Sequence, residues 1–168
     1  MKHRGKIVTT AILTVAVAGA WAWHRQSVGA LAETVTVPLG YHVRIHRPLG
    51  FSNEVLIYDI TAIDGSARRV DAIHALVAAA EQLQGDAFER VVLARSGQSR
   101  FWLDAHYVRQ LGRERPYQNG VYTVRTFPSH LRRMDGSEPW PAPRGGWLGA
   151  LSEEMNNVNA FLDEWLRP

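Results

Sequence analysis

The chain has 168 residues, a formal net charge of +3 from 19 Lys and Arg against 16 Asp and Glu, and no cysteine. The lack of cysteine excludes disulfide bonds, thiolate metal sites, catalytic thiols and a lipid-anchored N-terminal cysteine. Lys2, Arg4 and Lys6 carry the whole charge excess, because 16 basic residues then face 16 acidic residues in the rest. That neutral remainder argues against nucleic acid as a partner.

An uncharged apolar segment, Ile7 to Trp23, follows the basic start. As a helix it would span about 25 Å, the short end of what crosses a bilayer. Trp21 and Trp23 suit the interfacial aromatic belt, and the basic start favours a cytoplasmic N-terminus. The segment therefore predicts a single-pass anchor in the inner (cytoplasmic) membrane with the remaining chain in the periplasm.

A cleaved secretory signal is the alternative interpretation of the same segment. Small-x-small cleavage sites occur at Ala18–Ala20, Ala20–Ala22 and Ala30–Ala32. The bulky end of the segment and the His24-Arg25 pair after it favour the anchor. Cleavage would instead give a soluble periplasmic or secreted protein.

The chain is expected to contain one folded domain. Residues 1–24 form the basic start and the anchor or signal, residues 25–34 a linker, and residues 35–168 an extracytoplasmic domain. A domain of this size buries about two-thirds of its unfolded surface without disulfide bonds.

The first half of the domain predicts strand, strand, helix, strand. Tyr41–His46 alternates polar and apolar residues, and Glu54–Ile63 is nearly continuous in apolar and β-branched residues. Ser66 is expected to cap a helix that runs to Leu83, and Arg90–Arg95 is a second apolar strand. This order suggests a right-handed parallel crossover.

The second half begins with a predicted hairpin turn at residues 96–99 and a short strand at residues 100–103. Asp104 is expected to cap a helix that ends at Leu111, with Gly112 closing it and residues 113–120 as a loop. The alternation in Val121–Phe127 predicts another strand, and Pro128 a helical turn through Met134.

The C-terminal part combines an irregular segment with a long helix. Asp135–Trp147 contains three prolines and three glycines, which predicts loop structure. Leu148–Leu166 reads as an amphipathic helix whose apolar face comprises Leu148, Leu151, Met155, Val158, Phe161, Leu162 and Trp165. The fold class is therefore α+β: one N-terminal apolar helix, then a single domain with a mixed sheet of about five strands covered by two long helices.

No catalytic or metal-binding motif is recognisable. His42 and His46 lie about 13 Å apart on a strand, too far to share one ion. Asp104, His106 and Tyr107 are acid–base residue types close in sequence, but no nucleophile motif accompanies them. They are weak catalytic candidates, and no metal or cofactor is expected.

Two other sets of residues are candidates for binding. Arg95 and Arg100 flank the hairpin turn and could clamp a carboxylate or phosphate. Trp140, Arg144 and Trp147 lie in the long proline-rich loop, and Trp and Arg are favoured anchors of interfaces. The alternative for the tryptophans is that they fold back over the core.

These features are similar in layout to small bacterial envelope proteins: a basic start, one apolar segment and a compact cysteine-free domain. We expect a membrane-anchored, non-enzymatic domain that binds another envelope protein through the tryptophan-containing loop or a sheet edge. A soluble periplasmic ligand-binding protein, or a small envelope hydrolase or transferase using Asp104 and His106, is the alternative.

Overall fold

A computed structural model describes residues 40–48, 54–143 and 146–168. The chain divides into two units, Met1–Thr34 and Val35–Pro168, and all described residues belong to the second. The predicted anchor at residues 7–23 and Arg144 lie outside the described residues. Among those described, no helix is both long enough and apolar enough to cross a membrane.

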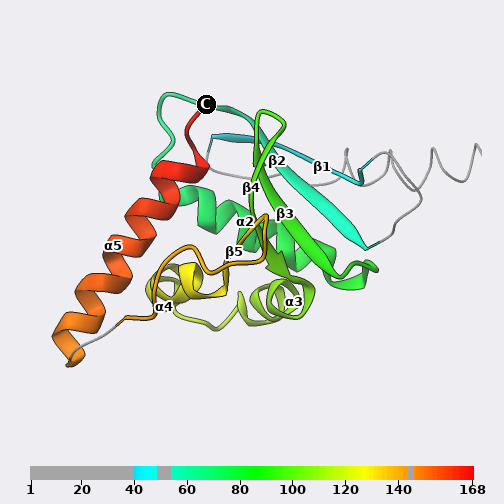
Figure 1. Cartoon of the computed structure of the whole chain (residues 1–168). Coiled ribbons are helices and arrows are strands. Elements are labelled where there is room, and N and C mark those ends of the chain that lie inside the picture. Colours follow the sequence, from blue (N-terminus) through cyan, green and yellow to red (C-terminus); the bar gives the residue numbers. More distant parts are fainter. Residues whose placement is uncertain (1–39, 49–53, 144–145) are drawn as a thin grey trace, which may run out of the picture. The chain divides into compact units, whose positions relative to one another are not determined.

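The domain is an α+β fold built on one mixed five-stranded sheet (Figure 1). Its strands follow chain order across the sheet: β1 (Tyr41–His46), β2 (Val55–Ile63), β3 (Arg90–Arg95), β4 (Gln98–Asp104) and β5 (Arg132–Arg133). The β2–β3 pair is parallel and the other three pairs are antiparallel. The mixed sheet and the parallel crossover are thus as predicted from the sequence.

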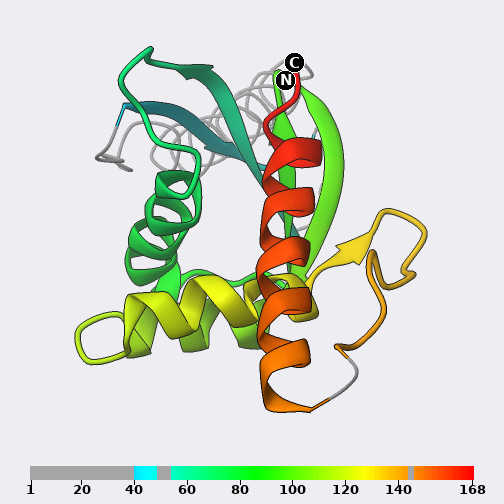
Figure 2. The ribbon, with the colours of Figure 1, turned by 90° about the vertical axis from the view of Figure 1, so that its left-hand side faces the viewer.

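The described residues form four α-helices. They are α2 (Asp71–Gln82), α3 (Ala105–Glu114), α4 (Gly120–Thr126) and α5 (Trp147–Trp165), with short 3-10 helices η1 (Leu83–Gly85) and η2 (Phe127–His130). The sequence predicted two long helices and a shorter one after Asp104, whereas the fourth helix, α4, occupies most of Val121–Phe127, which was predicted to be a strand. Figure 2 shows α2 and α5 on one side of the sheet, with α4 running across below α2 and beside the lower half of α5.

The start of the crossover helix differs from the prediction. Helix α2 begins at Asp71 rather than at Ser66, and its N-cap position, Val70, makes no side-chain hydrogen bond. The Tyr41 hydroxyl donates to the Arg68 carbonyl at 3.0 Å, and Ala67 N donates to the Asp64 carbonyl at 3.0 Å. These bonds hold residues 64–70 as turns, so the helix starts one turn later.

The hairpin prediction is confirmed at its turn. Ser96 and Gly97 both have positive φ, 51° and 81°, and connect β3 to β4 directly. A two-residue turn of this kind matches the right-handed twist of an antiparallel pair. The Gly97 N–H donates to the buried carboxylate of Asp59 on β2 at 3.1 Å, which ties the turn to the sheet.

Aromatic side chains join the last helix to the sheet. Trp165 is fully buried, lies 6.1 Å from Tyr58 between ring centroids, and donates from Nε1 to the Ala94 carbonyl at 3.3 Å. Phe161 packs on Phe101 of β4 at 5.5 Å. The C-terminal half of α5 is therefore part of the core.

Candidate binding sites

The three weak catalytic candidates point to different places. Asp104 is the N-cap of α3 and accepts from the His106 backbone N–H at 2.7 Å, as its predicted capping role requires. The His106 side chain is exposed at the helix start. Tyr107 is buried and stacks on His130, with ring centroids 3.7 Å apart. Within the described part of the chain, no side-chain hydrogen bond or ion pair joins these three residues to one another.

The Tyr107–His130 pair titrates unlike free side chains. Burial, followed by the nearby Glu114 carboxylate, raises the pKa of Tyr107. Burial, with a smaller effect of Arg132, lowers the pKa of His130. Both groups are therefore neutral at pH 7, which suits a packing contact better than an ion pair.

The two arginines that flank the turn bind different parts of the chain. Arg95 donates to the Ile60 carbonyl at 2.8 Å and to Ser96 Oγ at 3.0 Å. Arg100 donates to the Arg167 carbonyl at 3.0 Å, near the C-terminus. Each guanidinium thus has acceptors within the protein, and the two share none.

The two tryptophans of the proline-rich segment have opposite environments. Trp140 is half-buried, with its ring 5.7 Å from Phe101 and 6.4 Å from Phe161, so it covers the aromatic core. Trp147 opens α5 and is 77 % exposed. Trp140 also lines a small groove of about 150 Å³ with Pro139, Pro141 and Pro143. The third residue of the set, Arg144, lies outside the described part of the chain.

An exposed apolar strip begins at Trp147 and continues along α5. Leu148 is 70 % exposed and Met155 41 %, while Leu151 between them is half-buried. Trp147, Leu151 and Met155 are spaced four residues apart, so they lie on one side of the helix. We call Trp147, Leu148, Leu151 and Met155 the α5 strip.

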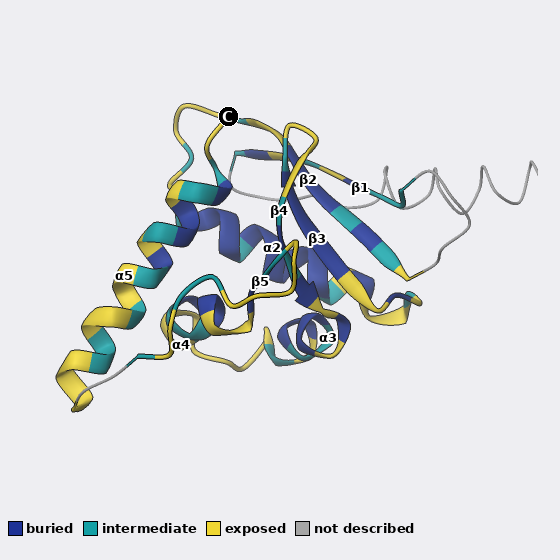
Figure 3. Ribbon diagram, in the orientation of Figure 1, coloured by how far each residue is buried: buried dark blue, intermediate teal, exposed yellow. Residues whose placement is uncertain are grey.

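The strip is the continuation of the face that α5 buries in the core. Val158, Phe161, Leu162 and Trp165 are buried, whereas the side chains two turns earlier are not (Figure 3). The sequence pattern predicted one uniformly inward face, and the structure corrects this for its first half. The apolar face of α5 thus runs along the whole helix, but the rest of the domain covers only its C-terminal half.

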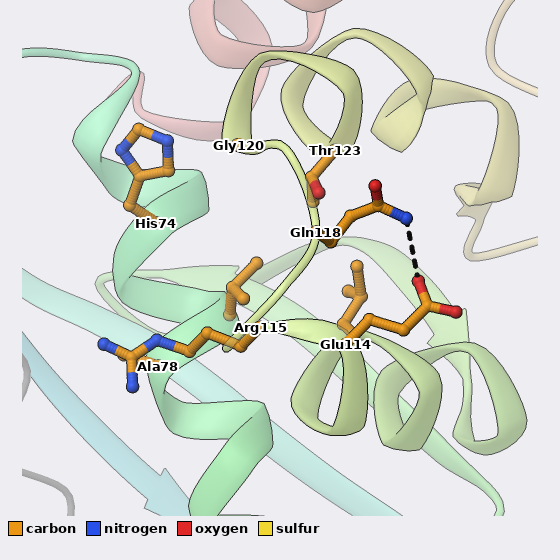
Figure 4. A pocket seen from close by; sticks show the side chains of 9 residues that line it. His74, Ala78, Glu114, Arg115, Gln118, Gly120 and Thr123 are labelled. Carbon is orange, nitrogen blue, oxygen red and sulfur yellow. Dashed lines mark hydrogen bonds between the residues drawn. The ribbon is translucent and has the colours of Figure 1, made fainter.

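A second candidate site is a cavity between α2, α3 and α4 (Figure 4). It has a volume of about 240 Å³ and is lined by His74, Val77, Ala78, Leu111, Glu114, Arg115, Gln118, Gly120 and Thr123. Val77, Ala78 and Leu111 are buried apolar residues of the two facing helices. The polar lining residues come mainly from the end of α3 and the segment that leads into α4. We call this space the helix cavity.

The buried carboxylate of Asp71 lies next to His74, the histidine of the helix cavity. Asp71 is 4 % exposed and accepts from Arg68 Nε and Nη2, each at 3.0 Å. Its Oδ1 lies 3.6 Å from His74 Nδ1. The hydrogen bond from Arg68 is the main cause that lowers the pKa of Asp71. An ionised Asp71 favours the His74 tautomer with its proton on Nδ1, which leaves Nε2 as an acceptor.

Sequence reasoning missed this arrangement because His74 lies in the apolar pattern of α2. Asp71 falls three residues before His74, one turn away on the same side of the helix. The Arg68-x-x-Asp71-x-x-His74 spacing was the available signal. It becomes informative only when α3 and α4 are known to close over this side of α2.

No known protein family, curated protein or solved structure matches this chain. Within residues 40–48, 54–143 and 146–168, no three His, Asp or Glu side chains gather as metal ligands do.

Proposed function

We propose that the chain is a membrane-anchored protein of the bacterial envelope whose periplasmic domain binds a second envelope protein through the α5 strip. The observation that supports this is the exposure of Trp147, Leu148 and Met155 on one short stretch of helix. Contiguous exposed apolar side chains on a soluble domain mark interaction surfaces. Trp is also the residue type most enriched among interface anchors.

The charges on α5 favour a protein partner over a lipid surface. Helices that lie on membranes carry Lys and Arg on their polar face. The polar face of α5 instead carries Glu and Asn, with Glu154, Asn156 and Asn157 beside the strip. Helix α5 contains no Lys or Arg that could bind anionic lipid headgroups.

The surrounding ion pairs indicate what the partner contributes. Glu154 pairs with Arg125 at 2.8 Å, and Glu164 pairs with Arg133 at 2.7 Å. Since these carboxylates are already paired within the domain, most of the binding free energy of a partner is expected to come from apolar contact. We therefore propose that the occupant is an apolar helix of the second protein, packed along the strip as ridges pack into grooves.

Position-specific crosslinking in cells tests this proposal. A photo-reactive amino acid placed at Leu148 of the full chain should give one discrete protein adduct. The same group at Tyr117, which is 78 % exposed on the α3–α4 connection, should not give that adduct. The double variant Trp147→Ala/Met155→Ala should reduce the Leu148 adduct at least about fivefold, because burying two large apolar side chains contributes a few kcal/mol.

Three outcomes would contradict the proposal. An adduct equally strong from Tyr117 would show that the strip has no special role. An adduct of twice the mass of the chain would show that the occupant is a second copy. Flotation of the purified protein with anionic vesicles, lost in Trp147→Ala/Met155→Ala, would show that the strip binds lipid.

A further inference from the structure

The helix cavity has features that the proposed docking surface leaves unexplained. Nδ1 of its histidine lies 3.6 Å from a buried carboxylate, and that carboxylate accepts two hydrogen bonds from Arg68. The hydrogen-bonding groups of the cavity lining determine which ligand it can recognise.

Most polar side chains around the cavity are already occupied by the protein. The Glu114 carboxylate accepts from Gln110 at 2.9 Å and from Gln118 at 3.3 Å. Gln118 in turn accepts from the Asn119 backbone N–H at 3.1 Å. The guanidinium of Arg115 pairs with Glu81 of α2. Each of these side chains thus makes at least one hydrogen bond or ion pair within the protein.

Two acceptors of the cavity lining also remain, one on Thr123 and one on His74. Thr123 Oγ1 donates its proton to the Asn119 carbonyl at 3.3 Å, so this oxygen can still accept a hydrogen bond from a ligand. His74 Nε2 is on the side of the ring away from Asp71 and close to Gly120. A Cβ added to Gly120 would lie only 3.7 Å from it. The missing side chain at position 120 leaves this nitrogen approachable.

We propose that the helix cavity binds a small, mostly apolar neutral molecule that donates one hydrogen bond, of the chemical class of phenols. Its apolar body would rest on Val77, Ala78 and Leu111, and its donor would reach His74 Nε2. A carboxylate ligand is disfavoured because Glu114 lies in the same wall, while the charge of Arg115 is already paired with that of Glu81. A volume of about 240 Å³ accommodates one aromatic ring with a short substituent.

The test compares two probes of similar shape, phenol and toluene, on the purified full chain at pH 8, where a free imidazole is neutral. Nitrogen chemical shifts of the His74 ring report binding and tautomer together. We expect phenol to shift Nε2 and to bind about tenfold more tightly than toluene, the effect of one additional hydrogen bond. The variant His74→Phe keeps a ring of similar size and should abolish the preference for phenol.

A second variant keeps the test independent of any change at His74. Gly120→Ala places a methyl group beside Nε2 at an ordinary contact distance, so it should weaken phenol binding about tenfold without strain. Gly85→Ala is the matched control, since a Cβ there meets nothing within 4 Å, and it should bind as the unchanged protein does. Equal affinity for both probes, unshifted His74 nitrogens, no phenol binding, or equal effects of the two glycine variants would each overturn the proposal.

Discussion

At the scale of single residues, identical side chains take opposite roles because of where the helices end. Trp140 and Trp147 are seven residues apart in one proline-rich segment, and composition predicts the same anchor role for both. Trp140 lies against the rings of Phe101 and Phe161, whereas Trp147 meets solvent. Residue type alone could not separate them, because the difference arises from the position of α5 relative to β4.

Replacing each tryptophan by alanine should therefore lower the free energy of unfolding by different amounts. Trp140→Ala should lower the free energy of unfolding by about 2 kcal/mol, somewhat less than a fully buried aromatic side chain because the ring is half-exposed. Trp147→Ala should change it by no more than about 0.5 kcal/mol, as for other exposed positions. Urea unfolding followed by circular dichroism measures both. Equal losses would mean that Trp147 is covered in the folded protein.

At the scale of elements, strongly patterned segments are predictable and short ones are not. The alternation in Tyr41–His46 and the β-branched run in Arg90–Arg95 gave strands at the observed residues. Val121–Phe127 also alternates, yet residues 120–126 form α4. Asn119 caps that helix by accepting from the Val121 N–H at 2.9 Å. A segment of seven residues is too short for its apolar pattern to distinguish a helix from a strand. The Asn119 cap and the packing of Val124 instead determine that this segment is helical.

Gly112 shows that a local sequence pattern can also misplace the end of a helix. A glycine at this place predicts the end of α3, but the helix continues through it to Glu114. The actual reason for the glycine is its contact with α2, where an added Cβ would lie 2.4 Å from the Ala80 carbonyl oxygen. This close approach of two backbones involves residues 32 positions apart, so no local pattern reveals it.

Replacing Gly112 by alanine should separate α2 from α3. The clash is with backbone atoms that cannot rotate away, and overpacking of this kind costs about 1–3 kcal/mol. Gly85→Ala, which meets open space, should leave stability unchanged or raise it by about 0.5 kcal/mol. Thermal unfolding of both variants measures the difference. Because the two helices also wall the helix cavity, Gly112→Ala should weaken phenol binding as well.

At the scale of the whole molecule, the exposed strip and the cavity lie on different helices and can be altered separately. The strip depends on the first two turns of α5, and the cavity on α2, α3 and α4. The sequence indicated the strip through its helical periodicity, although not its exposure. It did not indicate the cavity, because that site forms where α2 meets α3 and α4, which come from a later part of the chain.

Stability of the whole domain should depend on pH through His130. Burial against Tyr107 lowers the pKa of His130 in the folded state, whereas the unfolded chain has the ordinary value of about 6.5. Below pH 6.5 the unfolded state therefore binds more protons than the folded state. The contribution of His130 is complete above pH 6.5 and is lost as the pH falls through the folded-state pKa. Asp71 contributes at lower pH than His130. Because its pKa is lowered in the folded state, its contribution to stability is complete above the ordinary carboxyl pKa and is lost in stronger acid.

Urea unfolding at pH 7.5 and pH 5.5 tests this assignment. The unchanged protein should lose stability between the two values, and His130→Gln should lose less, since glutamine stays neutral throughout. His106→Gln is the matched control, because His106 is exposed at the start of α3 and should leave the pH dependence as it is. If His130→Gln retained the full difference between pH 7.5 and pH 5.5, proton uptake on acidification would have to occur at other histidines. The stacked Tyr107–His130 pair would then contribute to packing alone.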